Sequence, residues 1–175
     1  RTALIGKSHL QNMTTMAAFQ LAEAVPEGKT APPSALINAD KSAGKYDTQA
    51  YEQESAHQWQ DPEFEPSLPY YGFDEVIMAS HHTEVAGYHH RRHLDAIDPA
   101  IAQKAGRQRA TKGGEHNSQT FASAIAPEHY STRFISDATA NWLEQHTSAQ
   151  GETPFLLWCS ITDPHVPWTP PEKYY

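Results

Sequence analysis

The sequence contains almost no cysteine and has a shortage of positive charge, and each of these excludes a class of protein. With a single cysteine, Cys159, the 175 residues cannot form an internal disulfide framework, and the redox compartment stays open. There are 13 Lys and Arg residues against 21 Asp and Glu residues, which gives a net charge of −8. This balance provides no basic surface, so we expect no nucleic acid partner.

Long apolar runs are missing as well. No stretch approaches the roughly 20 residues that span a bilayer, and no charged and then apolar signal segment stands at the start. We therefore expect no membrane segment in these residues, and the localisation stays open. The length of 175 residues corresponds to about one domain.

One apolar run, residues 155–161, is rich in aromatic and branched side chains, which is typical of a buried strand in an α/β sheet. Ligands of such sheets bind beyond the carboxyl ends of the strands. His165 follows this run, and Pro164 and Pro167 restrict the backbone on both sides of it. His165 is therefore a candidate site residue; the alternative is a turn histidine without a task.

A second strand-like run, residues 2–5, ends at Gly6, which permits a sharp change of direction. Lys7 and His9 follow with a spacing of two, so in an extended segment both side chains leave on the same face. An ammonium group and a titratable ring that point together suit a tetrahedral oxyanion. On its own, however, such a pair is more often plain surface charge.

The stretches between these runs are helical or irregular. Ser131 is a candidate N-cap, and an apolar stripe at helical spacing follows it before Gly151: Phe134, Ile135, Ala138, Trp142 and Leu143. Strand, helix and strand predict the βα unit of a mostly parallel sheet flanked by helices. Residues 73–78 suggest a short strand or turn on that sheet.

Three further ranges have weaker patterns. Residues 12–25 show approximate helical spacing. Residues 26–69 and 98–120 are polar and interrupted by Pro or Gly, so we expect long irregular surface loops or insertions there.

Four segments together resemble the sulfatase family of the alkaline phosphatase superfamily, which includes arylsulfatases and phosphonate and phosphate monoester hydrolases. Residues 1–10 resemble the family segment Y-R-T-x-x-x-G-K-x-H-L, and residues 154–175 resemble P-F-F-L-x-x-S-x-x-D-P-H-x-P-x-x-P-P-x-x-Y. Residues 72–75 are similar to the family marker G-F-D-E, and residues 128–137 to the helix before the second strand. The segments occur in the family's order.

The resemblance implies an alkaline-phosphatase-like α/β fold and hydrolysis of sulfate esters, with phosphonate or phosphate monoesters as alternatives. It implies that Lys7 binds a nonbridging oxygen of the substrate and that His9 serves the nucleophile as a base. It implies that His165 contacts the transferred group near the leaving oxygen, as a hydrogen-bond donor or general acid. Ser8 stands where many relatives carry Trp, which leaves the substrate subclass open.

The family's nucleophile and metal ligands have no counterpart in the sequence. The nucleophile is a formylglycine made from the first residue of C-x-P-x-R or S-x-P-x-R, and Cys159 is followed by Ser-Ile-Thr-Asp instead. Strand burial predicts that Cys159 is an unreactive core thiol. We therefore expect an internal fragment of one larger catalytic domain, with the formylglycine and a divalent metal, calcium or alternatively manganese, outside this chain. A non-catalytic anion-binding relative is the alternative.

Five histidines lie close together in the sequence: His81, His82, His89, His90 and His93. Imidazoles at this density can bind zinc or copper, and His89 and His93 would share one face of a helix. No H-E-x-x-H pattern accompanies them, so we favour an active-site wall on which His81 or His82 contacts substrate.

Overall fold

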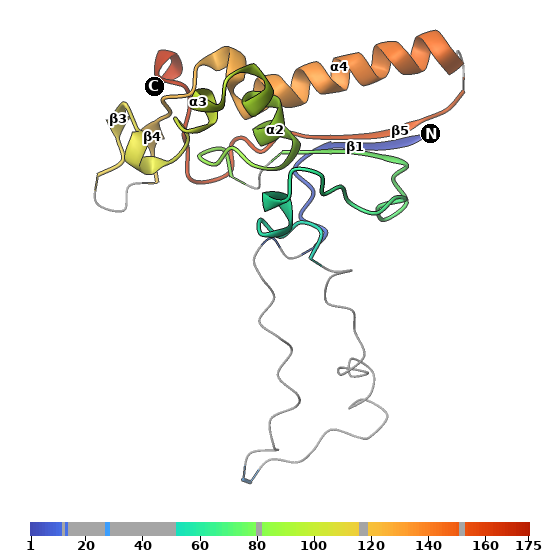
Figure 1. The fold of residues 1–175 in the computed structure, drawn as a ribbon, viewed down its shortest axis with the longest axis horizontal. Helices are drawn as coiled ribbons and strands as arrows, with labels where there is room; N and C mark the ends of the chain where they lie inside the picture. The colour runs from blue at the N-terminus through green and yellow to red at the C-terminus, as the bar shows by residue number, and fades with distance from the viewer. Residues whose placement is uncertain (12, 14–26, 29–51, 80–81, 116–118, 151–152) are drawn as a thin grey trace.

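The structure, a computed structural model, describes residues 1–11, 13, 27–28, 52–79, 82–115, 119–150 and 153–175 (Figure 1). Its centre is a parallel three-stranded sheet in the order β2-β1-β5. The strands are β1 (Thr2–Gly6), β2 (Glu75–Met78) and β5 (Leu156–Ser160). The described part is therefore a mixed α/β arrangement, as the alternation of patterns predicts.

The helices lie around this sheet. The long helix α4 (Ser131–Gln150) runs beside β1 and β5, as Figure 1 shows. Two shorter helices, α2 (Tyr88–Ile97) and α3 (Pro99–Ala102), follow β2, and a small antiparallel ribbon joins β3 (Lys112–Gly113) to β4 (Phe121–Ala122). The remaining described elements are short 3-10 helices: Gln58–Gln60, Arg107–Arg109, Pro127–His129 and Glu172–Tyr174. No described helix is both long and apolar enough to cross a membrane.

The register of the sheet brings the three strand ends to one edge. Gly6 pairs with Met78 on one side and with Ser160 on the other. The pairing continues past the strands, because Lys7 N donates to Ser160 O at 2.9 Å and Ala79 N donates to Gly6 O at 3.0 Å. Gly6 has a φ of 116°, and a Cβ there would lie 1.9 Å from Ser160 O. Only glycine fits this close approach.

The predicted stripe on α4 packs onto the sheet. Ile135 and Trp142 are buried against Ala3 and Ile5 of β1, and Phe134, Ala138 and Leu143 pack at the margin. The expected cap is wrong, because α4 already begins at Ser131 and the buried Ser131 Oγ has no hydrogen-bond partner. The hydrophobic pattern, and not the cap, therefore located this helix.

The expectation that residues 155–161 form a buried strand is wrong in part. The strand is present as β5, but it is an edge strand of the described sheet, and Leu156 is 58% exposed. Cys159 is exposed too, with Thr139 Oγ1 3.3 Å from its sulfur. The predicted burial of this thiol is therefore also wrong.

The Gly-Phe-Asp-Glu segment binds the first two residues of the chain. Arg1 pairs with Glu75, with Nη2 2.7 Å from Oε2. Thr2 N donates to Asp74 Oδ2 at 2.9 Å, and Thr2 Oγ1 donates to Gly72 O at 2.8 Å. These contacts join β1 and β2 at their amino ends, which is the opposite edge from the loops with Lys7 and His165.

The less patterned ranges contain local structure where they are described. Within 98–120, α3 places Ile101 and Ala102 in a small buried cluster. Within 26–69, residues 52–69 pack toward α2, and the Arg92 guanidinium lies 4.9 Å from the centre of the Trp59 ring. Apart from residue 13, the helical spacing at 12–25 lies outside the described residues.

Candidate active site

The three loops that leave the carboxyl ends of the strands carry the predicted site residues. Lys7 directly follows β1, His82 lies in the loop after β2, and His165 lies in the loop after β5. Because Gly6, Met78 and Ser160 are paired, these loops start side by side. This edge is where parallel α/β sheets bind ligands.

Two of the predicted residues are in direct contact. The rings of His82 and His165 lie with their centroids 4.8 Å apart and their planes at 30°. Buried hydrogen bonds connect their loops nearby, because Thr83 Oγ1 and Thr169 Oγ1 are 2.8 Å apart and Tyr130 OH donates to Thr169 O at 2.8 Å. Burial raises the pKa of Tyr130. The contact between the two imidazoles thus lies next to a buried, hydrogen-bonded group of side chains.

The loop around His165 is closed by its own hydrogen bonds. His165 N donates to Thr162 O at 3.0 Å, and Trp168 Nε1 donates to Pro164 O at 2.8 Å. The exposed ring of His165 turns Nδ1 onto Val166 O. A carbonyl oxygen only accepts, so Nδ1 carries a proton and Nε2 is the nitrogen that exchanges one.

Lys7 is a half-buried cation at the same edge. Burial lowers the pKa of its ammonium group. The ion pairs among the described residues do not include Lys7. A partly desolvated ammonium without a carboxylate partner is suited to bind an anionic ligand, because its attraction is weakly screened there.

The backbone after Lys7 wraps around a buried carboxylate, Glu54, which is 1% exposed. His9 N, Leu10 N and Gln11 N donate to its oxygens at 2.7, 2.9 and 2.9 Å, and Ser8 Oγ donates at 2.7 Å. Successive N–H groups around an anion form a nest. Glu54 was not among the predicted residues.

This nest changes the geometry expected for His9. Its φ is 62°, which is left-handed, so the segment is not extended at this residue. The spacing of two residues therefore does not by itself place the side chains of Lys7 and His9 on one face. The ring of His9 is exposed, while Ser8 points inward to Glu54.

Replacing Glu54 by Gln should destabilise the chain by about 3 kcal/mol, because one buried amide cannot accept from all these donors and brings a further donor among them. The buried Tyr70 hydroxyl also donates to Glu54 and would lose a charged partner. Urea unfolding with unchanged m-value measures the loss. Glu63→Gln, at an exposed position, is the matched control and should change stability by about 0.5 kcal/mol at most. Equal midpoints for the two variants would contradict the structural role of Glu54.

The remaining histidines of the cluster have other surroundings. His89 Nδ1 accepts from Met78 N at 2.9 Å, and His90 Nε2 lies 2.9 Å from His129 O. Burial lowers the pKa of both rings. His93 is exposed beside Phe134, and His81 lies outside the described residues. In the described ranges, no three His, Cys, Asp or Glu side chains lie close enough to hold a metal ion.

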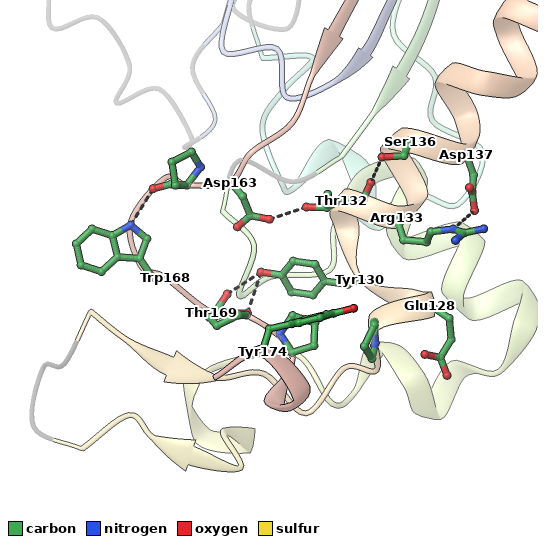
Figure 2. Close-up of a pocket in the computed structure, with 14 residues that line it drawn as sticks. Glu128, Tyr130, Thr132, Arg133, Ser136, Asp137, Asp163, Trp168, Thr169 and Tyr174 are labelled. Atoms are coloured by element: carbon green, nitrogen blue, oxygen red, sulfur yellow. Dashed lines mark hydrogen bonds and ion pairs between the residues drawn. The ribbon is translucent and has the colours of Figure 1, made fainter.

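An open pocket of about 910 Å³ lies between the loop of His165, the start of α4 and the last residues of the chain (Figure 2). Asp163 accepts from Thr132 Oγ1 there, and the ion pair of Arg133 with Asp137 stands on the wall, with Nε 2.7 Å from Oδ2. Neither Lys7 nor His165 lines it. The pocket therefore shares the loop of His165 but not the predicted residues themselves.

Comparison of the sequence with known protein families and with curated proteins, and of the structure with solved structures, found no match.

Proposed function

We propose that this chain is part of the catalytic domain of a hydrolase that cleaves sulfate esters, with phosphonate or phosphate monoesters as the alternative substrates. The observation that supports this most is the position of Lys7, His82 and His165 on loops that leave three adjacent strand ends, with the two imidazoles in contact. A cation and ring nitrogens at one edge suit a tetrahedral anion whose oxygens gain charge during cleavage.

In this proposal each residue has a separate task. Lys7 binds a nonbridging oxygen and stabilises the charge that develops on it. His165 exchanges a proton at Nε2 with the leaving oxygen, because its Nδ1 is occupied by Val166 O. His9 serves as base toward the nucleophile, and its exposed ring on the loop after β1 allows this. His82 contacts the substrate beside His165.

The sulfatase resemblance also implies a formylglycine nucleophile and a divalent metal, calcium with manganese as the alternative. The described residues do not fit either group, since they contain no cluster of metal ligands and Cys159 lacks the surrounding pattern. We therefore propose that both belong to segments of an alkaline-phosphatase-like domain outside these residues. The tasks proposed for Lys7 and His165 concern the substrate itself, whereas the task of His9 concerns the nucleophile.

The 175-residue chain on its own should show no turnover of nitrophenyl sulfate or nitrophenyl phosphate, whereas the complete protein should hydrolyse at least one of them. The reason is that this chain supplies charge and proton transfer but no activated nucleophile. Initial rates of the two purified proteins, at matched concentration and with added calcium or manganese, measure this. Turnover by the isolated chain would contradict the proposal.

A non-catalytic anion-binding relative is the second candidate, favoured only by the lack of a nucleophile motif in these residues. The two candidates differ in the preceding sequence of the complete protein, where the hydrolase requires C-x-P-x-R or S-x-P-x-R. A complete protein that binds inorganic sulfate through Lys7 but turns over no ester would establish the binding relative instead.

A further inference from the structure

A carboxylate stands behind His82. Glu84 Oε1 lies 3.3 Å from His82 Nδ1, and the side chain of Glu84 is largely buried, with 19% exposed. Its second oxygen, Oε2, is buried and has no hydrogen-bond partner in the described part of the chain. A carboxylate held this way loses hydration, so its contact with the His82 ring is its main polar interaction there.

The chemistry of this contact determines the proton on His82. An ionised carboxylate only accepts, so His82 Nδ1 must donate. In the neutral ring the lone pair then lies on Nε2, and in the protonated ring the positive charge lies beside the carboxylate. His165 has the same arrangement, because Val166 O occupies its Nδ1. In each of these two contacting imidazoles, Nδ1 therefore donates to an acceptor.

We propose that Glu84 is a positioning residue for the imidazole pair: it holds His82 in the Nδ1–H form and in contact with His165. A carboxylate that orients an imidazole in this way recurs where histidine exchanges protons with a ligand. The identity of the ligand, an anionic ester whose leaving oxygen exchanges the proton, rests on the proposed function. Thr83 lies between His82 and Glu84 in the sequence and anchors this segment to Thr169 through a buried hydrogen bond of 2.8 Å.

The test is the tautomer of His82, read by two-bond nitrogen–proton correlation spectra of the chain at a pH where the rings are neutral. In the wild-type chain His82 should show protonated Nδ1. Glu84→Ala should shift His82 toward the Nε2–H form, while Glu84→Gln, whose amide oxygen still accepts, should retain Nδ1–H. His165 is the internal control, because Val166 O holds its tautomer in every variant.

Protonated Nε2 in wild-type His82, or a His82 tautomer that is the same in Glu84→Ala, would overturn the inference. If Glu84→Ala fails to fold, a wild-type spectrum with protonated Nε2 on His82 still overturns the inference. Glu128→Ala, which removes an exposed carboxylate elsewhere, should leave the His82 signals in place.

Turnover separates this inference from the proposed function. In the complete protein, Glu84→Ala should lower kcat by about 10-fold or more with little change in KM, and Glu84→Gln should recover part of the loss. A complete protein without turnover but with the expected tautomers would reject the hydrolase and uphold the positioning role. A loss that appears only in KM would count against that role.

Discussion

Replacing Lys7 by Ala in the complete protein should lower the turnover of a sulfate ester by about 10²-fold or more. The ammonium group is half-buried and belongs to no ion pair among the described residues, so its charge is available to a ligand. It stands directly after β1, between the loops that carry His82 and His165. In the proposed hydrolase, this charge would stabilise a nonbridging oxygen as it becomes more negative during cleavage. The measurement is kcat and KM for nitrophenyl sulfate.

The matched control for this prediction is Lys104→Ala, which removes an exposed cation shortly after α3 and should leave the rate unchanged. Lys7→Arg restores charge without the compact shape of the ammonium, so it should recover only part of the rate. A Lys7→Ala rate within about twofold of wild type would remove Lys7 from the proposed site, since one lost charged donor costs far more than this. Unfolding midpoints close to that of the wild-type protein in both alanine variants would exclude a general loss of structure.

The local elements were predictable because each depends on a short stretch. The apolar stripe from Phe134 to Leu143 located α4, and the branched run after Arg1 located β1, since periodicity reflects the face that a residue buries. The exposure of β5 was not predictable in the same way. Composition indicates that Leu156 and Trp158 belong to a strand, but their burial depends on which elements lie against its edge and faces.

Some residues of the candidate site were likewise predictable from their own short segment, and others were not. Lys7 and His165 could be chosen from their own segments, because each follows a strand-like run and ligands bind at strand ends. Contact between His82 and His165 depends on β2 and β5 both flanking β1, which is a property of the assembled sheet. Glu54 gave no signal, because it meets the N–H of Gln11 across 43 residues of chain. A lone glutamate in a polar stretch predicts only solvent exposure.

Replacing His165 by Ala should cost the complete protein most with esters of weakly acidic alcohols and least with esters of acidic nitrophenols. With Nδ1 bonded to Val166 O, a proton transferred by His165 comes from Nε2. The alkoxide of a weakly acidic alcohol depends on receiving that proton as it leaves. A residue that only binds the substrate would instead slow all esters by about the same factor. The measurement is log kcat/KM for a series of aryl esters, plotted against the pKa of the leaving group.

A distinctly steeper negative slope for His165→Ala than for the wild-type protein is the expected outcome, and parallel lines would reduce His165 to a binding residue. Trp168→Ala is the matched control in the same loop. It removes the hydrogen bond of 2.8 Å from Trp168 Nε1 to Pro164 O but no group that can donate a proton to the ester. Its line should therefore keep the wild-type slope, with any loss of rate uniform along the series, because a loosened loop changes how well every ester is held. A steeper slope in Trp168→Ala as well would mean that loop closure, and not the His165 proton, governs the departure of the alcohol.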